Sequence, residues 1–134
     1  MATKRFIYLT YADAVENHFI LMRFYGESRI GIFDRNLVES ALARPKDSAF
    51  YEDGDVFRQA ATLCFGLIKN HPWFGGNKRT ATYLTEIFLE LNEYRLICEL
   101  SEIIEIALKV EADEWKVSEI EEWLGENAKK IENA

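Results

Sequence analysis

The feature that most constrains the fold is a segment that begins at Asp55 and ends at Asn70-His71-Pro72, in which apolar side chains fall on nearly every face of a helix. A helix at the surface carries one apolar stripe, whereas a helix that is apolar all round is enclosed by its neighbours. The segment is therefore predicted to be the central helix of the molecule. Pro72 fixes its end, because the residue before a proline is disfavoured in helical conformation.

Helical periodicity also covers most of the remaining chain. A second strong helix is predicted from about Asn77 to Asn92, and further helices are predicted at residues 10–25, 34–44, 99–110 and 117–124. Short apolar runs at residues 6–9 and 95–98 are each compatible with a strand, and the first also with a packed arm. The chain is therefore expected to fold as an all-α, single-domain bundle of about six helices spanning residues 1–134.

Two segments are predicted to lie outside the helices. Pro45 is expected to end the preceding helix near Arg44, which leaves residues 45–54 as a short flap loop or hairpin over a site. Arg44 and Lys46 beside this flap are candidate contacts for a nucleotide or a target protein, with ordinary surface charge as the equal alternative. The polar tail at residues 125–134 is expected to fray.

Charge and composition exclude several classes of function. The net charge of −7 argues against non-specific binding to nucleic acid or to an anionic membrane, since both need a basic surface. No apolar run approaches the ~20 residues of a membrane span, and residues 1–8 lack the apolar core of a signal peptide. A cytoplasmic protein is expected, with Cys64 and Cys98 as buried thiols and His18 as a packing or capping histidine.

The run from His71 to Ala81 combines the features of a phosphate-binding site. Glycines at positions 75 and 76 precede a helix start, where free backbone N–H groups and the helix dipole favour an anion. Asn77, Lys78 and Arg79 follow and add polar and cationic groups to the same turn. His71 ends the helix on the other side of the loop, and an imidazole suits a general base at neutral pH.

The same residues have a plainer interpretation. A Gly-Gly-Asn-Lys-Arg run between helices is often only a solvated turn, and a histidine before a proline is often a helix cap. Spacing and charge alone therefore leave both interpretations open.

The run resembles the signature of the Fic/Doc superfamily, and specifically of its death-on-curing (Doc) branch, whose pattern is His-Pro-Phe-x-acid-Gly-Asn-Gly/Lys-Arg. His71 matches the catalytic base of that signature, and Trp73 stands where a phenylalanine usually anchors the loop. The nucleotide- and phosphate-binding turn would be formed by Gly75, Gly76, Asn77, Lys78 and Arg79. Residues 31–45 resemble the region leading into the family's flap, and the likeness extends over about residues 6–124.

The resemblance implies a reaction with ATP. Fic enzymes usually transfer AMP to a protein hydroxyl, whereas Doc toxins transfer the γ-phosphate to a threonine of the translation factor EF-Tu and arrest translation. Lys78 favours the Doc branch, because its side chain would fill the space that a glycine of AMP-transferring enzymes leaves for the α-phosphate. His71, Lys78 and Arg79 would then be the catalytic residues.

Three departures from the family pattern refine this expectation. Gly75 stands where an acid usually binds Mg²⁺, so ATP is expected, the need for Mg²⁺ is left open and no metal ligand is assigned. Thr82 replaces a second arginine of typical Fic enzymes, which again favours the Doc branch. Residues 118–122 do not match the inhibitory Ser/Thr-x-x-x-Glu-Gly/Asn helix, so inhibition is expected from a separate, Phd-like antitoxin.

Three hypotheses about function follow. The leading one is a Doc-type toxin kinase that modifies a translation factor such as EF-Tu. The alternatives are an AMP transferase that acts on a protein hydroxyl and a catalytically degenerate binding protein that kept the fold, as Gly75 suggests.

Overall fold

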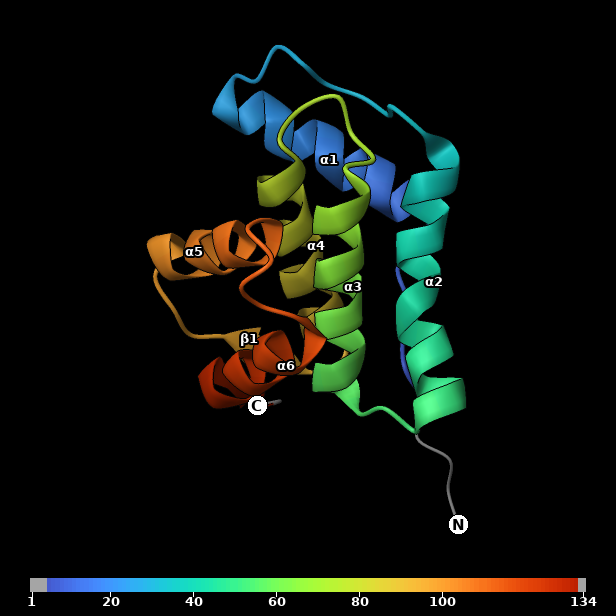
Figure 1. Cartoon of the computed structure of the whole chain (residues 1–134), viewed down its shortest axis with the longest axis vertical. Coiled ribbons are helices and arrows are strands. Elements are labelled where there is room, and N and C mark those ends of the chain that lie inside the picture. The colour runs from blue at the N-terminus through green and yellow to red at the C-terminus, as the bar shows by residue number, and fades with distance from the viewer. Residues whose placement is uncertain (1–4, 133–134) are drawn as a thin grey trace.

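The computed structural model describes residues 5–132, which form six α-helices and one small antiparallel sheet (Figure 1). The elements are α1 (Tyr11–Tyr25), α2 (Arg35–Glu52), α3 (Val56–Asn70), α4 (Asn77–Leu91), β1 (Tyr94–Leu96), α5 (Leu100–Glu111), α6 (Val117–Asn127) and β2 (Ala128–Lys130). The predicted all-α architecture is confirmed.

Helix α3 is the centre of the bundle, as its apolar pattern predicts. In Figure 1 it stands between α2 and α4, with α1 crossing near its C-terminal end and α5 and α6 on the other flank. Its buried residues include Leu63, Leu67 and Ile68, each at most 1% exposed. Burial of each such side chain contributes about 1.5–3 kcal/mol of transfer free energy. The break between α3 and α4 therefore follows directly from the buried central helix α3.

Helix α2 continues through Pro45 to Glu52, so the predicted helix end at Arg44 and the predicted flap at residues 45–54 are both wrong. Proline has no N–H to donate to the carbonyl four residues before it, which normally breaks a helix. Here Val38, Ala41, Pro45 and Ser48 share one buried face, and α2 packs antiparallel beside α3 (Figure 1). Burial of that face offsets the single missing hydrogen bond.

The two ends of the described chain are anchored. The backbone of Ile7 exchanges two hydrogen bonds with the Asn92 side chain, at 2.8 and 2.9 Å, so residues 6–9 form a packed arm and not a strand. Strand β1 confirms the short strand predicted near residues 95–98. It pairs with β2, so the prediction that the chain frays from Gly125 is wrong for the part through Lys130. The rest of that tail at 133–134, like residues 1–4 of the N-terminus, lies outside the described residues.

Side-chain caps and a glycine fix the ends of the first two helices. Thr10 and Asp13 form a reciprocal capping box at the start of α1, and Gly26 ends this helix with φ +67°, a conformation that suits glycine. Asp34 accepts backbone hydrogen bonds as the N-cap of α2. These caps fix where α1 ends and α2 begins, and so they fix the segment between them that lies against the loop after α3.

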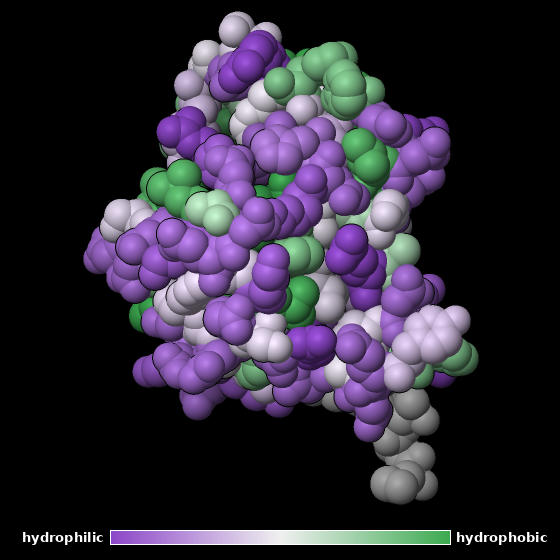
Figure 2. All heavy atoms as spheres, in the orientation of Figure 1, coloured by the Kyte–Doolittle hydropathy of each residue, from purple (hydrophilic) through white to green (hydrophobic). Residues whose placement is uncertain are grey.

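One face of the molecule can be judged from its side-chain hydropathy. Figure 2 shows a largely hydrophilic face with separate hydrophobic patches. Within residues 5–132, no helix combines the length and the apolar character that a membrane crossing requires. Cys64 is buried, and burial raises the pKa of its thiol to about 11, so it is an inert core residue. Cys98 is only partly buried, which corrects its predicted placement.

Candidate functional site

The candidate site is the six-residue break between α3 and α4. His71 caps the end of α3 in the left-handed region (φ +47°, ψ +56°), and Gly76 opens α4 in the same region (φ +65°). A left-handed conformation is uncommon for a residue other than glycine and costs free energy. The surrounding structure must therefore hold His71 in place.

The segment before α2 holds the loop by main-chain hydrogen bonds. The N–H of Phe33 donates to the carbonyl of Pro72 (2.9 Å), and the N–H of Phe74 donates to the carbonyl of Gly31 (3.0 Å). Ile32 and Trp73 pair across this contact as an isolated antiparallel bridge. The loop is thus fixed from its inner side by the connection between α1 and α2.

His18 is the side-chain anchor of that inner side. It is fully buried and stacks on the Trp73 indole with ring centroids 4.2 Å apart. The N–H of Gly31 donates to His18 Nε2 (3.1 Å), so Nε2 is unprotonated. A neutral ring then carries its proton on Nδ1, which lies 2.9 Å from Thr80 Oγ1 and donates to it. Burial lowers the pKa of His18 to about 4 and keeps it neutral, so its predicted packing role is confirmed.

Gly75 is enclosed by the same segment. A Cβ atom at this position would lie 2.7 Å from the carbonyl oxygen of Arg29 and 2.9 Å from the Arg29 Cβ. An acidic side chain here would collide with backbone. Residues 5–132 also bring together no group of three or more His, Cys, Asp or Glu side chains that could hold a metal ion. Position 75 therefore cannot carry the metal-binding acid of the family pattern unless Arg29 moves, and the described residues assign no set of protein ligands to Mg²⁺.

Asn77 braces the loop. Its Oδ1 accepts the Trp73 N–H (3.0 Å), and its Nδ2 donates to the Trp73 carbonyl (2.9 Å). Both functional ends of the amide are used internally. Asn77 therefore sets the shape of the turn that precedes the free N–H groups of α4.

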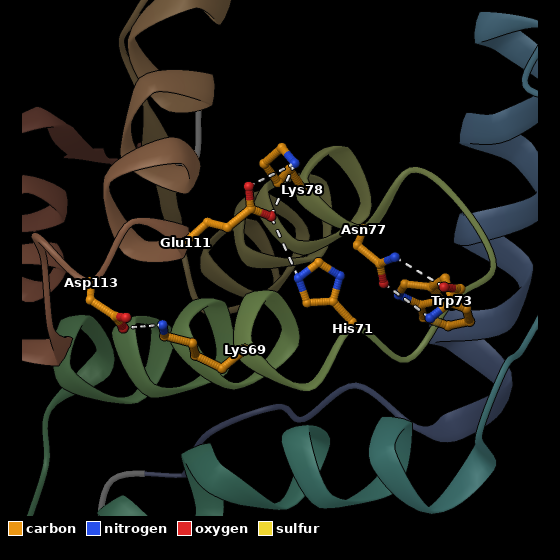
Figure 3. A network of polar contacts seen from close by, with 7 residues as sticks. All are labelled: Lys69, His71, Trp73, Asn77, Lys78, Glu111 and Asp113. Carbon is orange, nitrogen blue, oxygen red and sulfur yellow. Dashed lines mark hydrogen bonds and ion pairs between the residues drawn. The ribbon is translucent and has the colours of Figure 1, made fainter.

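His71 and Lys78 meet at one carboxylate on the outer side of the loop (Figure 3). Glu111, the last residue of α5, places Oε2 3.5 Å from His71 Nε2 and 3.1 Å from Lys78 Nζ. Its Oε1 lies 3.3 Å from the same Lys78 nitrogen. The predicted base and one predicted cation therefore face the same point in space, although they belong to two helices.

Arg79 faces elsewhere. Its guanidinium lies over the Tyr25 ring, 3.9 Å from the centroid. It lines a separate cavity of about 360 Å³ between α1, α4 and the start of α5. Glu27 lies near enough for the Arg79 charge to help lower the pKa of its carboxyl, although the hydrogen bond from the Arg29 N–H lowers that pKa more. In this arrangement Arg79 and Lys78 do not share a ligand position.

Arg44 and Lys46 lie on α2 and not on a flap. The Arg44 side chain runs beside Gly66 of α3, and the Lys46 ammonium lies 5.5 Å from the centroid of the Tyr8 ring. The contacts found within residues 5–132 join neither side chain to His71 or Lys78.

Sequence reasoning missed Glu111. It follows His71 by forty positions at the end of an ordinary amphipathic helix. A carboxylate at the exposed end of a helix carries no signal of its own. Only the packing of α5 against α4 brings it to the loop.

A comparison with models of known protein families identifies the family of this chain. The model of the Fic/DOC family matches residues 8–89, which include α1 to most of α4 and the whole break. This match covers more than half of the chain, so the chain belongs to the Fic/Doc family. Members of this family generally transfer nucleotide or phosphate groups to proteins. A search of curated proteins found no match.

Proposed function

We propose that this protein is a Doc-type toxin kinase, which transfers the γ-phosphate of ATP to a serine or threonine hydroxyl of a translation factor such as EF-Tu. The observation that carries the proposal is the meeting of His71 and Lys78 at one point beside the start of α4. There a base can accept the hydroxyl proton while Lys78 and the free N–H groups of the helix hold phosphate oxygens.

The chemistry asked of the protein is mainly positioning and charge neutralisation. The hydroxyl oxygen bonds to the γ-phosphorus as its proton passes to the His71 ring. The bond from that phosphorus to the bridging oxygen breaks, and ADP leaves with the electron pair. Gly76 keeps the turn tight, because it adopts the left-handed backbone that opens α4 and because a Cβ there would overlap the buried Met22 side chain. Arg79 would need to turn from Tyr25 to join this site, and no step is assigned to Mg²⁺.

The proposal includes the partners of the protein and its effect on cell growth. The expected partners are the modified translation factor and a small Phd-like antitoxin that inhibits the toxin in trans, both in the cytoplasm. Expression without the antitoxin should arrest growth, and His71→Ala should relieve the arrest.

The test uses translation extract and ATP labelled in either the α- or the γ-phosphate. Transfer of the γ-label alone is expected. Transfer of the α-label alone would replace the proposal with AMP transfer.

A non-catalytic binding protein is the second candidate, favoured by the enclosed Gly75. It would give no transfer of either label while still binding a partner from the extract. Transfer that depends on His71 would exclude it.

A further inference from the structure

The pairing of His71 with Glu111 points to a further functional residue. We infer that Glu111 is the positioning residue of the transfer site: its carboxylate fixes the orientation of the His71 ring and stabilises the imidazolium formed when the ring takes a proton. This inference rests on the proposed function for the step it serves, and its structural part can be tested alone.

The contact assigns the two ring nitrogens different tasks. Nε2 of His71 lies 3.5 Å from Glu111 Oε2, and the other ring nitrogen points away from the carboxylate (Figure 3). A neutral ring that turns Nε2–H towards the carboxylate leaves Nδ1 with a free lone pair. Nδ1 is then the atom that accepts the hydroxyl proton, and the carboxylate stabilises the resulting positive charge.

The surroundings of His71 leave the orientation of its ring to the Glu111 carboxylate. His71 is held in the left-handed region as the last cap of α3, so its backbone is fixed but its ring remains about half exposed. Within residues 5–132, the structure gives the ring no other polar partner. Glu111 is thus the contact that selects one ring orientation.

Lys78 shares the same carboxylate. Its Nζ lies 3.1 and 3.3 Å from the two Glu111 oxygens. Phosphate oxygens arriving at the start of α4 would compete with Glu111 for this ammonium. Binding of ATP would therefore free the Glu111 carboxylate from Lys78 and leave it to contact His71. The Glu111 carboxylate would then orient the His71 ring most strongly when ATP occupies the site.

The chain offers a matched control two residues away. Asp113 lies in the turn that follows α5. It pairs with Lys69 (Figure 3) and with Lys116, and no contact among the described residues joins it to His71. Its backbone is left-handed (φ +63°), a conformation that asparagine tolerates. Asp113→Asn therefore removes one charge from the same surface without touching the His71 contact.

The first test is spectroscopic and needs no activity. The chain has only two histidines, so ¹⁵N-histidine labelling yields two ring systems that can be assigned with His71→Ala. Glu111→Gln is expected to shift both ring nitrogens of His71 and to leave those of His18 unchanged, while Asp113→Asn shifts neither. Unchanged His71 resonances in Glu111→Gln would overturn the inference.

The second test separates kcat from KM in the transfer assay. Glu111→Gln is expected to lower kcat by about 10- to 100-fold, which is part of the ~10²–10⁴-fold that general-base catalysis supplies. KM for ATP should stay equal or fall, because Lys78 is released. A rise in KM with unchanged kcat, or an equal loss in Asp113→Asn, would contradict a positioning role. If the wild type transfers no label, the proposed function fails. The ¹⁵N spectra of the histidine rings then test the His71–Glu111 pairing independently of the proposed function.

Discussion

The two histidines lie on opposite sides of the same loop and have opposite environments. His18 on the inner side is 0% exposed and has partners at both ring nitrogens. His71 on the outer side has a side chain that is 51% exposed, and its ring contacts one carboxylate among the described residues, that of Glu111. The inner histidine is locked in one neutral form, whereas the ring of the outer one is open to solvent and to a ligand. The loop is thus divided into a supporting side and a chemically available side.

This division predicts where substitutions reduce stability and where they reduce activity. Inner-side changes should lower the free energy of unfolding, and outer-side changes should leave it almost unaltered.

The largest expected effect is at Trp73, which is 2% exposed and stacks on His18. Trp73→Ala should lower the free energy of unfolding by about 3–5 kcal/mol, because it leaves a cavity under the loop. The neighbouring Phe74 is 55% exposed, so Phe74→Ala should cost less than about 1 kcal/mol. Urea unfolding of both variants measures the difference, and equal losses would contradict the inner-outer division.

The second effect is a pH dependence set by His18. Burial lowers the pKa of this ring from 6.5 to about 4. Between these two pH values the unfolded chain binds a proton at His18, whereas the folded protein does not. Stability is therefore complete above pH 6.5 and falls as the pH drops towards 4, by about 2 kcal/mol at pH 5. Urea unfolding between pH 7.5 and 5 measures this slope.

His71→Ala is the control for that slope. It should retain the pH dependence between pH 7.5 and 5, because the ring it removes is exposed and the His18 environment is unchanged. A flat profile in the wild type, or loss of the slope in His71→Ala, would contradict the assignment to His18.

The third effect concerns the enclosed glycine. Gly75→Ala should destabilise the protein by about 1–3 kcal/mol, because its Cβ would collide with Arg29. Gly125→Ala on α6 meets nothing closer than 4.0 Å and should stabilise by about 0.5–1 kcal/mol. Thermal unfolding compares the two variants. An unchanged unfolding temperature in Gly75→Ala would show that the loop and Arg29 can move apart to make room for the Cβ. For the same reason, Gly75→Asp is not a clean way to restore a metal-binding acid.

The smallest stability effect is at Lys78, whose ion pair with Glu111 is partly exposed. Lys78→Gln should change the free energy of unfolding by less than about 0.5 kcal/mol. It should weaken ATP binding, because one of the groups proposed to hold the phosphates is lost. Calorimetric titration with ATP measures this, and unaltered affinity would remove Lys78 from the proposed site.

The sequence predicts the helical frame well because the frame depends on local patterns. Apolar periodicity locates α3 and α4, and the helices predicted at residues 10–25 and 34–44 begin within one residue of the starts of α1 and α2. The wrong prediction at Pro45 arose because burial of one face of α2 outweighs the local preference of proline to end a helix.

The site was predictable only in part for a related physical reason. The run from His71 to Arg79 is continuous in sequence, so its residues could be proposed from spacing and charge. Glu111 comes from another helix, and the orientation of Arg79 towards Tyr25 depends on where α1 ends in space. Contacts of this kind depend on tertiary packing, which leaves no pattern in the sequence.

The most direct test of the central claim compares transfer of the γ-phosphate label by the wild type and by His71→Ala. The account predicts that the wild type labels a protein of the translation extract. It predicts a rate about 10²–10⁴-fold lower for His71→Ala, with an unchanged unfolding temperature. Equal transfer by the two proteins would show that the outer side of the loop is not the site of the chemistry.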